Sequence, residues 1–174
     1  MIEACVLSED DPVELLEGWI VSKMPRNPQH DGTIQIASER IREILPNGWV
    51  IRSQSAITTE DSEPEPDLCI ARGNTRSFLE RHPAPNQIGV LIEVANSSLE
   101  HDRTVKGRTY AKAGIALYWI INLNDRLIEV YSNPSNADPS PTYLNRLDFS
   151  DVDRIPFILD DVEIGGLSVR ELLP

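Results

Sequence analysis

The chain has 174 residues, of which 40% are hydrophobic and 25% are charged, a composition typical of a globular domain with a sizeable core. No apolar run approaches the roughly 18 residues that a membrane span needs, and the beginning lacks a basic leader. The net charge of −12 counts against nonspecific binding to nucleic acid, because Lys and Arg supply most of that affinity. The two cysteines, Cys5 and Cys69, lie far apart in the sequence. We therefore expect one disulfide-free, cytoplasmic domain over residues 1–174, without a membrane segment.

The first third of the chain predicts a flap and then a long helix. Residues 12–17 are typical of a short helix, and residues 19–21 of a strand that ends before two prolines. From His30, apolar residues recur at intervals of three and four until Pro46, Asn47 and Gly48 stop the pattern. This periodicity predicts an amphipathic helix of about four turns.

The rest of the chain alternates apolar runs with helical segments. We expect strands at residues 49–51, 67–71, 88–95, 117–121 and 127–131, weaker strands at 143–147 and 155–159, and a possible extension at 54–57. We expect helices at residues 75–82, 99–113 and from 168 onward. A crossover helix between the strands at 88–95 and 117–121 favours an α/β fold. Its central mixed β-sheet would be flanked by helices, with extra β elements near both termini.

Two carboxylates stand out because each belongs to an apolar run. Asp67 begins one run, and Glu93 is the lone charge within the next. If these strands pair antiparallel, both carboxylates meet at one sheet edge, where with the Val94 carbonyl they would supply oxygen ligands for Mg²⁺. Such an ion held against a phosphodiester indicates a nuclease. The alternative is structural, with Asp67 capping a loop end and Glu93 paired with an arginine.

The predicted helix at 99–113 brings cations toward these acids. No acid occurs between Arg103 and Asn124, whereas Arg103, Lys106, Arg108 and Lys112 form a local basic stretch. On one helical face, Lys106 would point at the carboxylates together with Arg103 and Tyr110. The spacing allows a simpler reading, in which Lys106 forms a surface salt bridge with Asp102.

Other candidates are weaker. His30, at the start of the first long helix, would contact phosphate or water at the metal, or would simply be exposed. Neither a zinc-type spacing nor a Gly-rich phosphate loop is found in the sequence, so no organic cofactor is expected.

The motifs together resemble the Uma-type restriction endonuclease family, a branch of the PD-(D/E)XK nuclease superfamily. The similarity runs from ELLEGWIVSKMP and His30 through EPEPD and LIEVANSSLEHDRTVKGRTYAKAGIALYWIIN to GGLSVRELL, nearly the whole chain. The resemblance implies a restriction-endonuclease-like fold, a homodimer and metal-dependent hydrolysis of DNA, with Mn²⁺ able to replace Mg²⁺. Asp67 and Glu93 would carry the metal. The superfamily's lysine would fall at Ala95, so Lys106 would be its relocated equivalent.

Three functions follow as hypotheses. The first is a Mg²⁺-dependent DNA endonuclease with Asp67, Glu93 and Lys106 as catalytic residues, and with contacts to nucleic acid from Arg103, Arg108, Lys112, His30 and Tyr110. The second is a catalytically inactive nuclease-fold module that binds nucleic acid or a protein partner, which Ala95 and the acidic surface motivate. The third is a nuclease for RNA or for single-stranded or structured DNA.

Overall fold

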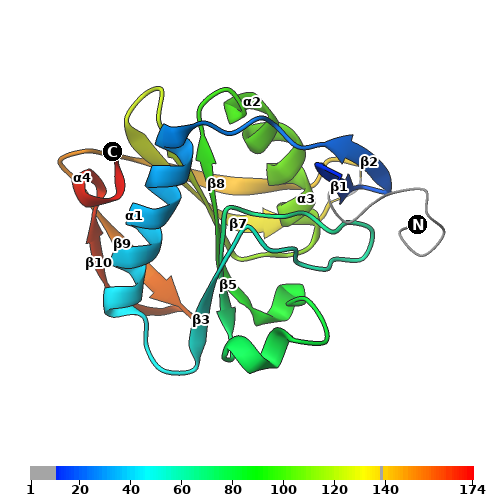
Figure 1. The fold of residues 1–174 in the computed structure, drawn as a ribbon, viewed down its shortest axis with the longest axis horizontal. Helices are drawn as coiled ribbons and strands as arrows, with labels where there is room; N and C mark the ends of the chain where they lie inside the picture. Colours follow the sequence, from blue (N-terminus) through cyan, green and yellow to red (C-terminus); the bar gives the residue numbers. More distant parts are fainter. Residues whose placement is uncertain (1–10, 138) are drawn as a thin grey trace.

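The computed structural model describes residues 11–137 and 139–174, and a six-stranded mixed β-sheet lies at its centre (Figure 1). In their order across the sheet the strands are β3 (Trp49–Ser53), β4 (Leu68–Arg72), β5 (Ile88–Ala95), β6 (Leu117–Asn122), β7 (Leu127–Ser135) and β8 (Thr142–Ser150). Every neighbouring pair is antiparallel except β5 and β6, which are parallel. A parallel pair needs a crossover, and the helical segment between β5 and β6 supplies it. The expected central mixed sheet is therefore confirmed.

The crossover is a helix with an irregular middle. It consists of α2 (Leu99–His101), the π-helical segment η3 (Asp102–Lys106) and α3 (Gly107–Lys112). The bond that defines the wider turn runs from the Gly107 N–H to the Asp102 carbonyl, five residues back. Such π turns are rare and frequently lie at functional sites. The sequence pattern predicts a regular helix here, because amphipathic spacing does not reveal a local change of hydrogen-bond step.

Two hydrophobic clusters cover the two faces of the sheet. On one face, α1 (Pro28–Ile44) packs through Ile34 and Ile41 against alternate residues of the central strands, including Ile92. On the other face, Tyr110 of α3 packs with Tyr118 of β6. The alternation of side chains along a strand assigns β5 residues to opposite faces, so Glu93 lies on the face that α2, η3 and α3 cover.

Two β-hairpins lie outside the central sheet (Figure 1). The N-terminal pair is β1 (Val13–Leu16) with β2 (Trp19–Ser22). The C-terminal pair is β9 (Arg154–Leu159) with β10 (Val162–Ser168), followed by α4 (Val169–Leu172), which lies beside α1.

The structure also corrects several expectations drawn from the sequence. The helix expected at residues 12–17 is wrong, because this segment pairs with β2 and buries Glu14 and Leu16 with strand periodicity. The expectation overlooked β10, whose pattern is interrupted by Gly165 and Gly166. The helix expected at residues 75–82 is limited to a 3₁₀ helix at Thr75–Phe78, and residues 54–57 form no strand.

Two general expectations can be compared with the described residues. Among them, no helix has the length and apolarity that crossing a membrane requires. Cys69 is a buried free thiol on β4, and burial raises its pKa to about 12. The other cysteine, Cys5, lies outside the described residues.

Candidate active site

The two predicted carboxylates lie side by side because of the strand register. In the antiparallel pair, Leu68 of β4 is opposite Ile92 of β5. Asp67 immediately precedes β4 and therefore lies next to Glu93, whose Oε2 accepts a hydrogen bond from the Asp67 N–H at 3.3 Å. Both side chains line one pocket of about 220 Å³. The expectation that they meet at one edge is confirmed.

The Asp67 carboxylate is held in a fixed orientation by two donors. Its Oδ2 accepts a hydrogen bond from the Val94 N–H at 2.8 Å and lies 3.1 Å from His30 Nε2. His30 reaches it from the first turn of α1, where the Asn27 side chain caps the helix by accepting from the His30 N–H. Burial opposes charge on the imidazole, but the hydrogen bond and charge of Asp67 outweigh it, so the His30 pKa is raised.

The Glu93 carboxylate is buried and shared by two donors of the crossover helix. Its Oε1 accepts from Lys106 Nζ at 2.9 Å and from the Tyr110 hydroxyl at 2.6 Å. The structural alternative expected an arginine as the partner of Glu93; the partner is a lysine, Lys106. The surface salt bridge considered for Lys106 with Asp102 is also absent from the described ion pairs, because the amine points inward from η3.

Glu14 completes this cluster, and the sequence did not indicate it. Its Oε2 lies 3.5 Å from Lys106 Nζ and accepts a hydrogen bond from the Glu65 N–H at 3.1 Å. The residue belongs to β1, which reaches the pocket from outside the central sheet. Had residues 13–16 been predicted as a strand, Glu14 and Leu16 would have been expected on one face. The prediction of a helix here gave no reason to place Glu14 in the site.

The pocket contains more buried acids than cations. Glu14, Asp67, Glu93 and Asp102 are all buried around the single buried amine of Lys106. Burial raises the pKa of Glu93 well above its usual value; the attraction of Lys106 lowers it, but burial, with the repulsion from Asp67 and Asp102, prevails. Burial likewise raises the pKa of Asp102 to about 6. Burial alone would lower the pKa of Lys106, but the surrounding carboxylates raise it, so the amine remains protonated.

This surplus of negative charge fits a divalent cation. Among residues 11–137 and 139–174, no group of three or more His, Cys, Asp or Glu side chains forms a ready-made metal site. Mg²⁺ does not require one, because it commonly uses one or two carboxylates and completes its shell with water and substrate phosphate. Asp67 and Glu93 have the right chemistry for this role, and Val94 lies beside them on the pocket wall.

The cations that the sequence suggested as contacts for nucleic acid are engaged within the protein. Arg108 forms a two-point ion pair with Glu17, at 2.6 and 2.7 Å. Lys112 Nζ lies 2.6 Å from Asp61 Oδ2. Arg103 pairs with Glu129 rather than with the pocket. Since these pairs neutralise the side chains, they would have to open before the cations could bind phosphate.

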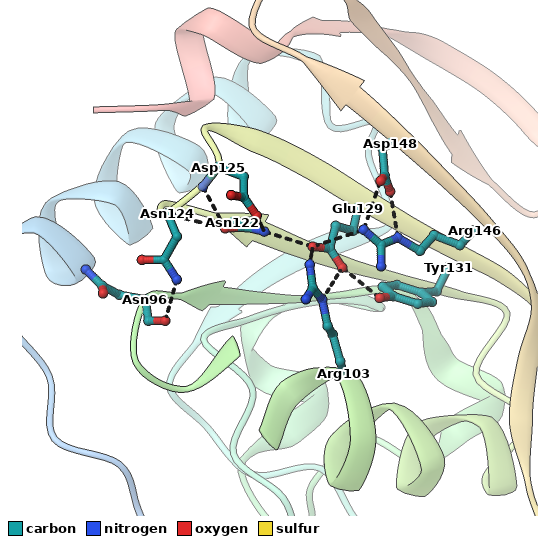
Figure 2. Close-up of polar contacts among 9 residues, drawn as sticks. All are labelled: Asn96, Arg103, Asn122, Asn124, Asp125, Glu129, Tyr131, Arg146 and Asp148. Atoms are coloured by element: carbon teal, nitrogen blue, oxygen red, sulfur yellow. Dashed lines mark hydrogen bonds and ion pairs between the residues drawn. The ribbon is translucent and has the colours of Figure 1, made fainter. Parts of the chain in front are cut away.

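Arg103 joins the crossover helix to a second buried carboxylate (Figure 2). Its Nε and Nη2 donate to the two oxygens of Glu129 at 3.0 and 2.5 Å. The Glu129 side chain, on β7, is fully buried and accepts further hydrogen bonds from Asn122 at 2.9 Å and Tyr131 at 2.7 Å. Burial alone would raise the Glu129 pKa, but these donors and Arg146 lower it. This network fixes the helix three residues before Lys106.

Replacing Glu129 tests whether its contact with Arg103 anchors the helix. We expect Glu129→Gln to lower the free energy of unfolding by about 1–3 kcal/mol, because a neutral amide leaves Arg103 without its counter-charge. Chemical denaturation measures the change. Asp148→Asn is the matched control, since Asp148 binds Arg146 at the exposed side of the network (Figure 2). Equal stability of the two variants would show that the buried carboxylate does not anchor the helix.

The raised pKa of Asp102 predicts a pH dependence of stability. Well below about pH 4 the carboxyl is protonated in the folded and unfolded chains alike. As the pH rises toward the folded-state pKa of about 6, the unfolded chain loses its proton first, so the free energy of unfolding falls. Asp102→Asn should reduce this loss between about pH 4 and 6 by about 1–3 kcal/mol. Denaturation at several pH values measures it, with the exposed Asp161→Asn as control; identical slopes would contradict the assignment.

Comparison with known proteins assigns the chain to a family. The Uma2 family model, described as "Putative restriction endonuclease", matches residues 2–159. A solved structure of a DUF820 protein from Anabaena variabilis ATCC 29413, titled as a putative nuclease, is 16% identical. The match covers 98% of this chain and 94% of that one, with a TM-score of 0.70. At this identity the likeness shows a shared fold, which is nuclease-like. No curated protein matches the chain. The chain belongs to the Uma2 family of restriction-endonuclease-like nucleases.

Proposed function

We propose that the protein is a Mg²⁺-dependent endonuclease that hydrolyses phosphodiester bonds in DNA. The observation that carries this proposal is the Glu93 carboxylate, which lies beside Asp67 while its Oε1 accepts hydrogen bonds from Lys106 and Tyr110. A carboxylate pair with a protonated amine, in a pocket with surplus negative charge, suits a metal-bound phosphodiester.

Asp67 and Glu93, with the Val94 carbonyl, would hold the ion. When bound, Mg²⁺ neutralises charge on the phosphate oxygens and favours a nucleophile at neutral pH. The protein's own contribution is orientation. The Val94 N–H and His30 fix the Asp67 carboxylate, and Tyr110 fixes that of Glu93. Ligands held in place by surrounding donors keep their geometry when the substrate arrives.

Lys106 supplies positive charge at the reacting phosphate. Because its pKa is raised, the amine is a stabiliser of negative charge and a hydrogen-bond donor, not a base. One of its N–H groups is directed to Glu93, and the weaker contacts at 3.5 Å to Glu14 and the Glu65 carbonyl can be exchanged for a phosphoryl oxygen. A preorganised donor of this kind stabilises the charge that develops in hydrolysis.

The assembly and location of the enzyme are part of the same proposal. A homodimer would bring two pockets to the two strands of a duplex, and the site of action would be the cytoplasm. The net charge of −12 makes DNA binding weak and sensitive to salt. Cleavage should therefore be assayed at low ionic strength.

Loss of either carboxylate should abolish cleavage. We expect Asp67→Asn and Glu93→Gln each to reduce the rate of plasmid and oligonucleotide cleavage in Mg²⁺ or Mn²⁺ by at least about 10²-fold. Asp151→Asn, a surface carboxylate, should cleave as the wild type does. Undiminished cleavage by Asp67→Asn would refute the proposed site. A substrate panel of duplex DNA, single-stranded DNA and RNA identifies the preferred nucleic acid.

A metal titration separates an absent site from an unsuitable substrate. Calorimetry with Mn²⁺ should detect binding to the wild type and none to the folded double variant Asp67→Asn, Glu93→Gln. No binding to the wild type, even with a short oligonucleotide present, would indicate instead a nuclease-fold module without catalysis.

Removal of the buried amine should slow chemistry. We expect Lys106→Gln to reduce kcat by about 10²–10³-fold, the usual effect of losing one charge-stabilising donor. Arg170→Gln, a change on the exposed side of α4, is the control. The thermal unfolding temperature of Lys106→Gln must be measured in parallel, since Glu93 loses its neutralising partner. An unchanged kcat in a folded variant would remove Lys106 from the catalytic set.

A further inference from the structure

A polar groove continues from the carboxylate pocket. Arg26 and Gln54 line both spaces, so the groove of about 560 Å³ begins where the pocket ends. It is lined by residues of α1 and by Ser53 at the end of β3, and these two elements lie beside each other (Figure 1). Its remaining walls come mainly from polar residues of α1. A ligand whose reacting group occupies the carboxylate pocket would therefore extend into this groove.

The groove contains two arginines that form no ion pair within the described part of the chain. Arg26 and Arg42 have neither an ion-pair nor a hydrogen-bond partner among the described residues. The cations of the crossover helix differ in this respect, because Arg103, Arg108 and Lys112 are each neutralised by a carboxylate. Free guanidinium groups bind phosphate or the edge of guanine in a two-point geometry without first breaking an internal bond.

The other groove residues suit hydrogen bonding more than charge attraction. Gln35 and Gln54 present amides, which donate and accept and which read base edges. Asp31 and Glu39 balance the two arginines, so the groove carries no formal net charge, in contrast to the acidic pocket. Asp31 also lies 3.3 Å from His30 Nδ1. A nucleic-acid strand can thus enter along this groove without crossing a strongly negative surface.

We propose that this groove binds the nucleotides that flank the scissile phosphate of a DNA strand. Arg26 and Arg42 would contact backbone phosphates, and Gln35 with Gln54 would contact bases. The inference rests on the proposed nuclease function and locates its substrate along α1 and the neighbouring residues Arg26 and Gln54, away from the cations that the sequence favoured. It makes these four residues determinants of affinity and sequence preference, without a role at the reacting atoms.

Binding measured without divalent metal tests the groove separately from catalysis. The probe is a short fluorescein-labelled single DNA strand, followed by fluorescence anisotropy in EDTA at low salt. We expect the double variant Arg26→Gln, Arg42→Gln to raise Kd about tenfold or more. The negative slope of log K against log salt should become less steep by about 1.4, because two phosphate contacts are lost. Arg40→Gln is the matched control, because this exposed α1 arginine pairs with Glu43 and lies outside the groove.

The outcomes separate the two proposals. Equal affinity of the double variant and the control would overturn the groove, while metal-dependent cleavage lost in Asp67→Asn would still support the nuclease. Absence of binding by the wild type would overturn the groove as well. If the groove binds substrate, the double variant should raise KM in the cleavage assay and leave kcat within a few-fold of the wild type. A fall in kcat at unchanged KM would count against a purely binding role.

Discussion

The shared hydrogen bonding of Glu93 is the interaction on which the site depends. A lone carboxylate in an apolar strand is costly to bury unless it is paired, and here Lys106 and Tyr110 both donate to one of its oxygens. Those donors belong to the crossover helix, whereas Glu93 belongs to the sheet. The contact therefore joins the two layers at the point where the reaction is proposed to occur. Tyr110 belongs to the hydrophobic cluster on this face, and Lys106 lines the pocket, so the same helix both covers the sheet and forms the site.

A second cation-carboxylate contact binds the helix to the sheet, three residues before Lys106. Arg103 binds Glu129 (Figure 2). Glu129 lies two strands away from Glu93, on the same face of the sheet. Glu93 and Glu129 flank Ile120 of β6, which pairs with both. The helix is thus fixed to the sheet by one cation-carboxylate pair on each side of an apolar strand. The two pairs act at different positions along the helix, so together they oppose its translation and rotation over the sheet and thereby position Lys106.

The sequence predicted the elements that follow a clear hydrophobic period and the carboxylate pair that depends on strand register. Asp67 and Glu93 meet because antiparallel pairing leaves few alternatives for the start of one strand and the end of the next. The sequence did not predict residues whose place in the site, or whose ion-pair partner, is determined by contacts between distant parts of the chain. Glu14 belongs to a hairpin whose four-residue strands are too short to show their period. The partners of Arg103 and Arg108 lie 26 and 91 residues away, and helix spacing does not encode such pairings.

The π turn makes the site depend on the number of residues in the helix as well as on their identity. Its wide turn closes on the Asp102 carbonyl, which also accepts a hydrogen bond from the Tyr118 hydroxyl at 3.1 Å. Because a π turn takes up about one residue more than an α turn, winding the same residues as a regular α-helix would rotate those beyond the turn by roughly 100°. Tyr110 would then turn away from Glu93, although every residue named in the site would still be present. The match between the length of this helix and its wide turn therefore maintains the site as much as the identity of its side chains does.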